Sequence, residues 1–300
     1  MGGLHERSGY RISVIVPTRV GWPDMRRSLD AILPQLERSG AELIVADSSG
    51  RPLPDFADAD NVTWLLMPGA PSHALRQAAY AAATGPVIAI TEDHCMPEAA
   101  WLEHILEEHE RDPDAAGIFG LVDNGSRDHA VDWALFSVGY LAWAPPKPAL
   151  RGSPGHANLS FKSWIFDVMP ALDDQVLEFR YVAALRLAGY RVVGTDRTLV
   201  THFQSAGLPA TAALMFHNGR TIAGLRRKRM TAVDWLRVGA PGPVAIFRSW
   251  RMMRLARDKR QIQGAVQRSL PLIVVLNLAH TVGESVGYLG GAGQSGRRLH

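Results

Sequence analysis

Short apolar runs that alternate with helix-like segments dominate the N-terminal third and limit the fold classes open to this chain. The runs are 11–17, 42–47, 61–67 and 87–90. Between them, leucine and isoleucine recur at helical spacing around Leu29 and Leu36, and an alanine-rich stretch follows Ser72. Because strand and helix alternate at this spacing, the sequence predicts an α/β domain with a mostly parallel, doubly wound sheet.

The pattern continues less regularly after residue 110. Helical spacing predicts helices over about 98–109 and 176–188, and strand-like runs cover 191–194 and 199–202. The segment 123–160 is rich in Gly, Pro and Trp, and it could shape a substrate pocket. In doubly wound sheets, ligands bind at the carboxyl ends of the strands. Residues that directly follow the apolar runs are therefore the first candidates for a site.

An acidic and imidazole cluster, Glu92-Asp93-His94, directly follows the buried run 87–90. Such groups are costly to place at the end of a buried strand unless they bind something. Thr18 and Asp47 end two other runs, so they are expected at the same edge of the sheet. A divalent metal that carries a phosphorylated substrate is the ligand that this pattern favours.

Several other site types are not signalled by the sequence. Cys95 is the single cysteine, which excludes an internal disulfide and a zinc cluster built on thiolates, and which fits a reducing compartment. No G-x-G-x-x-G follows the first run, and G-x-x-x-x-G-K-S/T is absent from the chain. The sequence therefore signals neither a dinucleotide-binding domain nor a P-loop.

The ordered set of motifs over about residues 11–205 resembles the GT-A glycosyltransferases, specifically glycosyltransferase family 2. The resemblance implies a GT-A fold, in which a Rossmann-like, mostly parallel sheet is flanked by helices. Bacterial, membrane-associated members of the family look most similar. The matching motifs are Val14-Ile15-Val16-Pro17-Thr18-Arg19, Asp47, Arg76 with Ala83-Thr84-Gly85-Pro86-Val87-Ile88, Glu92-Asp93-His94, and Pro97 with Trp101-Leu102.

The resemblance assigns the donor nucleotide to residues near the strand ends. Asp47 takes the place of the aspartate that binds the base, and Arg76 would face the diphosphate. On the sequence alone, a solvated arginine on a helix surface is the other interpretation of Arg76. The full set of expected nucleotide contacts is Pro17, Thr18, Arg19, Asp47, Arg76, Glu92 and Asp93.

The expected metal ligands are His94, His202 and Glu92, with Asp93 as the alternative carboxylate. The family's D-x-D motif reads Glu92-Asp93-His94 here, and this variant is similar to the D-x-H form of the polypeptide N-acetylgalactosaminyltransferases, in which a later histidine completes the site. Imidazole is a poor ligand for Mg²⁺, so Mn²⁺ is preferred and Mg²⁺ remains possible. Alternatively, His202 caps a strand and His94 only forms hydrogen bonds.

The catalytic base implied by the resemblance is Glu178, at the start of the helix expected before Gly189. A carboxylate suits the removal of a proton from an acceptor hydroxyl. Asp173 and Asp174 are nearby competitors for this role. Further pocket candidates near the donor sugar are His156, Asn158 and Asp174.

The charge of the chain is strongly asymmetric. Residues 220–268 hold thirteen Lys and Arg against two Asp, a balance of +11, whereas residues 1–219 have a balance of −9. The apolar segment 270–289 follows, with one polar stripe at helical spacing. Its uninterrupted apolar run is too short for a membrane span, so an interfacial helix beside a polybasic segment is expected. The other interpretations are a solvated basic face with a core helix, or a nucleic-acid surface, which is not expected.

These patterns divide the chain into a GT-A domain, 1–209, and a helical, basic, membrane-associating region, 210–300. The predicted function is metal-dependent, inverting transfer of a sugar from a nucleotide-diphosphate sugar to a hydroxyl of an envelope, lipid-linked or other glycan acceptor. The predicted location is the cytoplasmic face of the membrane, peripheral or monotopic. The alternative is a non-catalytic relative that binds sugar nucleotides or acts as a scaffold.

Overall fold

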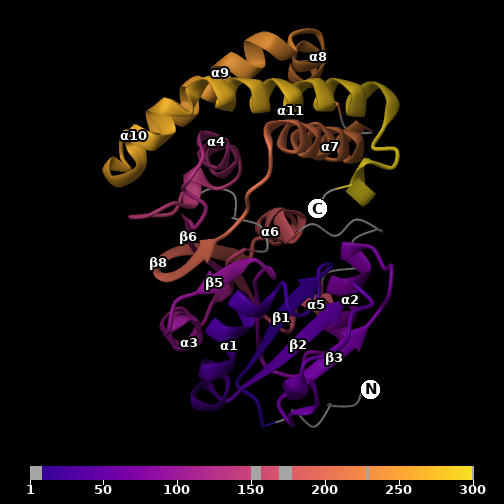
Figure 1. Cartoon of the computed structure of the whole chain (residues 1–300), viewed down its shortest axis with the longest axis vertical. Helices are drawn as coiled ribbons and strands as arrows, with labels where there is room; N and C mark the ends of the chain where they lie inside the picture. The colour runs from indigo at the N-terminus through magenta and orange to yellow at the C-terminus, as the bar shows by residue number, and fades with distance from the viewer. Residues whose placement is uncertain (1–8, 150–156, 169–177, 228–229, 299–300) are drawn as a thin grey trace. The chain divides into compact units, whose positions relative to one another are not determined.

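The computed structural model describes residues 9–149, 157–168, 178–227 and 230–298 (Figure 1). The chain forms two compact units. The first unit combines Met1–Asp123 with Trp143–Phe203, and the second combines Asn124–Ala142 with Gln204–His300. The expected domain boundary at residue 209 lies close to Phe203, after which the chain leaves the first unit for the second. The inclusion of 124–142 in the second unit was not expected from the sequence.

One sheet runs through the first unit, and within the described residues it has eight strands in the order β3-β2-β1-β4-β7-β6-β8-β5. The strands from β3 to β4 are mutually parallel, whereas β7 pairs with β4 and β6 in the antiparallel sense. The strand bounds are β1 Ile12–Thr18, β2 Ala41–Asp47, β3 Val62–Leu66, β4 Val87–Ile90, β5 Cys95–Pro97, β6 Ala115–Asn124, β7 Leu159–Lys162 and β8 Arg191–His202.

Helices cover the sheet and fix its core. The α-helices of this unit are α1 Arg26–Ser39, α2 Ser72–Ala82, α3 Trp101–Arg111, α5 Ile165–Val168 and α6 Glu178–Leu187, with short 3₁₀ turns at η1 Asp55–Asp58 and η2 Leu141–Trp143, the latter shared with the second unit. Leu75 of α2, Ile165 of α5 and Leu185 of α6 pack with Ile15 and Ile88 of the sheet in one buried cluster. Because side chains alternate between the faces of a strand, each near-continuous apolar run supplies two buried faces.

The strands and helices expected in the first unit are present, and β5, β6 and β7 lie where the sequence predicted no strand. The two runs expected around 191–194 and 199–202 form the single strand β8, Arg191–His202. The segment 123–160, which was expected to shape a pocket, contains the helix α4, Ala130–Gly139. The charged residues between the two runs, Asp196 and Arg197, lie at exposed or partly exposed positions of β8, so the backbone continues as one strand through them.

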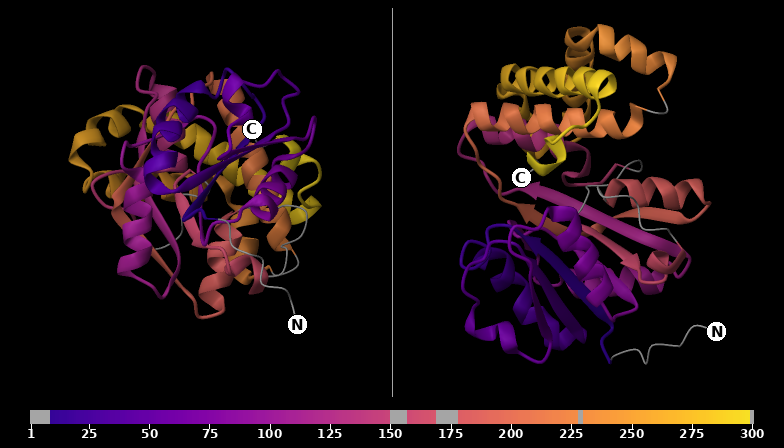
Figure 2. Two further views of the ribbon diagram at one scale, coloured as in Figure 1. Left: turned by 90° about the horizontal axis from the view of Figure 1, so that it is seen from below. Right: turned by 90° about the vertical axis from the view of Figure 1, so that its right-hand side faces the viewer.

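The second unit is helical. Besides α4, it contains α7 Leu208–Arg226, α8 Ala232–Gly239, α9 Pro241–Ala256, α10 Arg260–Arg268, α11 Leu270–Gly290 and the 3₁₀ turn η4 Ser295–Arg298. Figure 2 shows α7 and α11 running alongside each other. Glycines permit this approach: a Cβ on Gly219 would lie 2.1 Å from the carbonyl oxygen of His280, and one on Gly283 would lie 2.1 Å from that of Phe216. The backbones of the two helices are therefore in direct contact.

The polar stripe of α11 points into the helical unit rather than toward solvent. Asn277 donates a hydrogen bond to the Ser249 hydroxyl (3.0 Å), and Arg248 donates to both oxygens of Glu284 (2.8 and 3.0 Å). Among the described residues, α11 is the helix with the length and composition to cross a membrane, a criterion that core helices of soluble proteins also meet. The polar side chains of α11 thus hold the helices together.

Replacing Gly283 by alanine should destabilise the second unit by about 1–3 kcal/mol, because the added methyl group has no space against α7. The matched control is Gly264→Ala on α10, where the nearest atom is the Arg268 guanidinium at 3.4 Å. Greater helix propensity should make that change neutral or stabilising by up to about 1 kcal/mol. Chemical denaturation followed by circular dichroism measures both. Equal stabilities for the two variants would contradict the close packing.

Candidate metal centre

Pairing between β5 and β8 brings together residues that are far apart in the sequence. The two strands are antiparallel, with Cys95 opposite His202 and Met96 opposite Thr201. The pairing extends by one further bond, because the Phe203 amide donates to the His94 carbonyl (3.0 Å). His94 and His202 are thereby placed on the same end of the ladder, next to Glu92 at the end of β4.

Three ligand atoms converge at this point. His94 Nε2 lies 3.0 Å from His202 Nε2, and Glu92 Oε2 lies 3.4 Å and 3.2 Å from these two nitrogens. Ligands ~2.0–2.2 Å from a divalent ion, at angles of about 90–109°, are separated by roughly 3.0–3.5 Å. The three atoms therefore already have the spacing of ligands on one face of a metal ion, and all lie within 4.8 Å of one another.

The donor set selects among divalent ions. Two imidazoles and one carboxylate suit Mn²⁺, Fe²⁺ or Zn²⁺, whereas Mg²⁺ prefers oxygen ligands. Three ligands on one face leave coordination positions for substrate oxygens and water. The residues thus fit the expected metal, with Glu92 rather than Asp93 as the carboxylate that joins the two histidines.

Asp93 orients the His94 imidazole and is not part of the ligand cluster. Its Oδ1 lies 2.7 Å from His94 Nδ1, and its Oδ2 accepts a hydrogen bond from the Thr18 hydroxyl (2.7 Å). A carboxylate on one imidazole nitrogen fixes the tautomer, so the lone pair of His94 Nε2 faces the ligand cluster. The Thr18 hydroxyl in turn accepts from the amide of Gly21 (3.0 Å). Thr18 and Asp93 are therefore expected to position a metal ligand rather than to contact the metal themselves.

The three clustered residues differ in solvent exposure, and the neighbouring Cys95 is uncharged. The side chain of His94 is 37% exposed, whereas those of Glu92 and His202 are 10% and 5% exposed, so the cluster opens to solvent at His94. Burial raises the pKa of the Cys95 thiol well above its ordinary value, and the nearby Glu92 carboxylate raises it further. Cys95 is therefore a packed, neutral neighbour of the site, consistent with its complete burial.

Asp47 lies on the next strand of the same edge. It ends β2 as the register partner of Thr18, and its carboxylate accepts hydrogen bonds from the Ser49 amide (2.7 Å) and from Trp64 Nε1 (3.1 Å). The ring of Phe56 lies between those of Trp64 and Trp22, at centroid distances of 6.4 and 5.5 Å. A fixed carboxylate beside aromatic rings can recognise the edge of a flat heterocycle.

The remaining residues that the sequence predicted for the site differ in burial, and several lie outside the described residues. Pro17 is half-buried and Arg19 is exposed beside Thr18, while Arg76 is only 4% exposed on α2 and is therefore not a solvated surface residue. The backbone of Glu178 begins α6, but its side chain lies outside the described residues, as do His156, Asp173 and Asp174.

Asn158 has a structural environment. Its amide nitrogen donates to the carbonyls of Leu121 (2.8 Å) and Thr198 (3.1 Å), and its oxygen accepts from Trp101 Nε1 (2.9 Å). The side chain is only 1% exposed. From the start of β7, the Asn158 side chain links β6, β8 and α3. Its hydrogen bonds are therefore made within the protein.

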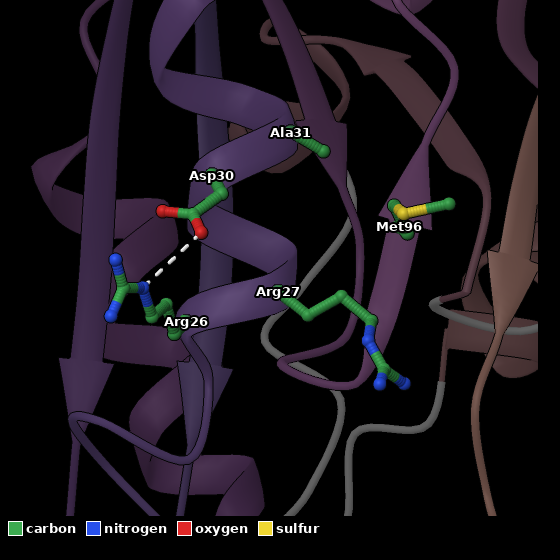
Figure 3. A pocket seen from close by; sticks show the side chains of 5 residues that line it. All are labelled: Arg26, Arg27, Asp30, Ala31 and Met96. Carbon is green, nitrogen blue, oxygen red and sulfur yellow. Dashed lines mark hydrogen bonds and ion pairs between the residues drawn. The ribbon is translucent and has the colours of Figure 1, made fainter.

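Arg27 is a residue that the sequence did not single out. Its guanidinium carbon lies 4.0 Å from the centroid of Phe203, the residue that follows His202. It also lines a shallow pocket of about 470 Å³ with Arg26, Asp30, Ala31 and Met96, and Figure 3 shows its side chain extending toward Met96. Arg27, in the first turn of α1, thus contacts the residue that directly follows His202 in the sequence. Surface arginines at helix starts carry no distinctive sequence signal.

Replacing Asp93 by alanine should weaken Mn²⁺ binding about 10–100-fold, because the His94 imidazole loses the carboxylate that orients it. His94→Ala should reduce binding further, since it removes a ligand. Asp60→Ala, at an exposed aspartate, is the control and should bind as the unmodified chain does. Calorimetric titration with Mn²⁺ alone gives the affinities. Unchanged affinity in Asp93→Ala would contradict the positioning role.

Asn158→Ala should lower the free energy of unfolding by about 3 kcal/mol, because it leaves two buried carbonyls and an indole N–H without their partner. Mn²⁺ affinity should stay within about twofold, since no metal ligand touches this side chain. Denaturation and the same titration separate the two effects. A stable variant with impaired ligand binding would instead support the pocket role expected from the sequence.

Comparison with known proteins finds a family model that matches part of the chain. Residues 13–134 match the family model for glycosyl transferase family 2. No curated protein matches the chain. A structure of the mannosyltransferase PcManGT from Pyrobaculum calidifontis, in complex with GDP-Man and Mn²⁺, is similar at a TM-score of 0.54 and 17% identity, covering 93% of this chain and 87% of that one.

A crystal structure of GalNAc-T7 with UDP, GalNAc and Mn²⁺ is similar at a TM-score of 0.48 and 14% identity. That match covers 65% of this chain and 43% of the GalNAc-T7 chain. The fold of the first unit is GT-A, as the strand order and the likeness to the mannosyltransferase indicate. Residues 13–134 of this chain are therefore similar to glycosyl transferase family 2, the family whose model they match.

Proposed function

We propose that this protein is a metal-dependent, inverting glycosyltransferase that moves a sugar from a nucleotide-diphosphate sugar to a hydroxyl of a glycan or lipid-linked acceptor. The observation that carries the proposal is the convergence of Glu92, His94 and His202 within 4.8 Å at the ligand-binding edge of a GT-A domain. When bound there, a divalent metal would stabilise the negative charge of the diphosphate leaving group. The similar mannosyltransferase structure holds GDP-Man and Mn²⁺, which agrees with this choice of ligands.

The donor nucleotide is proposed to lie along the ends of β2, β1 and β4. Asp47 would accept hydrogen bonds from the base or ribose, oriented for this by Trp64 and Ser49. Pro17, Thr18 and Arg19 belong to the neighbouring strand end, and Thr18 connects Asp47 to the metal ligands through its bond with Asp93. This arrangement supports a donor that extends from Asp47 to His94.

Arginine side chains are proposed to bind the diphosphate. Arg76 is buried on α2, where a guanidinium needs anionic or hydrogen-bonding partners. Arg27 lies against Phe203, which directly follows His202 in the sequence. Guanidinium groups pair well with phosphate oxygens, so either residue could hold the leaving group in place.

Glu178 is the proposed catalytic base. In an inverting transfer, the acceptor oxygen bonds to the anomeric carbon while the bond from that carbon to the diphosphate oxygen breaks, and the base receives the hydroxyl proton. The start of α6 at Glu178 agrees with the expected place of the base near a helix N-terminus. Asp174 is the alternative carboxylate.

The proposed setting is the cytoplasmic face of a membrane, where an envelope or lipid-linked glycan is the acceptor. The +11 charge of residues 220–268 supports attachment to an anionic surface, since each basic residue near such a surface contributes about 1 kcal/mol.

Glu178→Gln should lower the turnover of the donor at least about 100-fold, because the amide cannot accept the hydroxyl proton, while donor affinity stays within about twofold. The donor is first identified by a thermal-shift screen of nucleotide sugars with and without Mn²⁺. Glu37→Gln, at an exposed glutamate of α1, is the control and should keep full turnover. Proton NMR of the product reports the anomeric configuration.

Each outcome of this experiment has a distinct meaning. Full activity of Glu178→Gln would exclude Glu178 as the base, and a product that keeps the donor's configuration would exclude inversion. Mn²⁺-dependent binding without turnover across a broad panel of acceptors would favour a non-catalytic sugar-nucleotide-binding relative.

A further inference from the structure

The exposed side of α11 consists of apolar residues. Five of them recur at intervals of three or four positions and are 36–55% exposed. Because this spacing matches the period of an α-helix, they form a single stripe along its whole length. We call this set the α11 stripe: Val275, Leu278, Val282, Val286 and Leu289. Every other exposed position of the helix is Pro or Gly, so it presents no charge to its surroundings.

The polarity of α11 is therefore the reverse of that of a helix on the surface of a soluble protein. A surface helix in water normally buries its apolar side and exposes its polar side. In α11, Thr281 donates to the Pro241 carbonyl (3.0 Å) and the Tyr288 hydroxyl donates to Asp234 (2.8 Å), while Glu284 holds Arg248. The inward polar contacts fix the rotation of the helix, so the stripe cannot turn inward.

The neighbouring helix α9 displays a face that suits a membrane interface. Its exposed residues Phe247 and Trp250 stack at 5.9 Å, and the Arg254 guanidinium lies 5.1 Å from the Trp250 ring. Arg251 and Arg257 are exposed on the same face, one turn before and after Arg254. Aromatic rings followed by arginines match the boundary between acyl chains and phosphate headgroups.

The charge of the second unit favours an anionic bilayer over a second copy of the chain as the partner of the α11 stripe. Exposed basic residues on and beside the helices α7, α9 and α10 include Arg226, Arg227, Arg251, Arg254, Arg257, Arg260 and Arg268. Of the described acidic residues in this region, Asp234 and Glu284 are buried and Asp258 is exposed. A second copy would bring like charges together, whereas an anionic bilayer offers both apolar chains and negative headgroups.

We propose that the α11 stripe is immersed in the acyl-chain region of an anionic bilayer, with the arginines of α9 and α10 at the headgroups. This inference deepens the proposed membrane attachment by naming the surface that enters the lipid. Attachment by charge alone is screened by salt, because the Debye length falls to about 3 Å at 1 M, whereas an immersed apolar stripe keeps its affinity.

The test uses the full chain with one introduced cysteine. Cys95 is completely buried, so Val282→Cys offers the single accessible thiol for an environment-sensitive fluorophore. On vesicles of phosphatidylcholine and phosphatidylglycerol, its emission should shift to the blue and be quenched by spin labels on the lipid acyl chains. Leu187→Cys, 88% exposed in the first unit, is the matched control and should report water.

A second variant tests the energetic role of the stripe. Leu278→Glu with Val282→Glu should lower the vesicle-bound fraction in 1 M salt at least about tenfold, because two charges would enter the acyl region. Both positions are partly exposed, so folding should persist, and circular dichroism checks this. Leu187→Glu should bind as the unmodified chain does.

The outcomes distinguish immersion of the α11 stripe from the membrane attachment on which that inference rests. Low-salt binding that is lost in high salt, with the Val282 probe in water, would overturn the immersed stripe while membrane attachment stands. Failure to bind anionic vesicles at any salt concentration would overturn both. A blue shift without vesicles that rises with protein concentration would assign the stripe to a second copy instead.

Discussion

The antiparallel pairing of β5 with β8 is the interaction on which the candidate site depends. It aligns Cys95 with His202 across the ladder and places His94 beside the end of β8. A slip of one residue would turn the His202 side chain to the opposite face, because side chains alternate along a strand. The backbone bond from the Phe203 amide to the His94 carbonyl extends this register by one residue, and the Thr18 hydroxyl donates to Asp93 beside it. The candidate metal ligands are thus positioned by the sheet itself.

The two units use polar groups in different ways. In the first unit, carboxylates and imidazoles gather at one edge of an apolar sheet, where they lie within reach of solvent and ligand. In the second unit, polar groups lie between helices, and the contact of Arg248 with Glu284 joins α9 to α11. Glycines bring α7 and α11 close enough for their backbones to touch. This interior leaves apolar side chains on the outside, the feature that favours lipid as the partner.

Much of the first unit could be predicted from local patterns. The strands observed at Ile12–Thr18 and Val87–Ile90 follow from continuous apolar runs, and the Leu29 to Leu36 spacing marks α1. Other features needed contacts between distant segments. The role of Asp93 depends on Thr18, which lies 75 positions away, and the presence of Arg27 near His202 depends on how α1 meets the end of β8. The structural role of Asn158 likewise rests on Leu121 and Thr198.

The sequence by itself determined the α/β class, the family resemblance, and which residue types could bind a metal, because these follow from the period of apolar residues and from the chemistry of Glu92, His94 and His202. The tertiary structure decided which carboxylate faces the histidines, since the backbone directs Glu92 into the cluster and Asp93 behind it. It also decided which side of α11 is exposed. Helical spacing reveals that a polar stripe exists, but only the neighbouring helices determine whether that stripe faces water or protein.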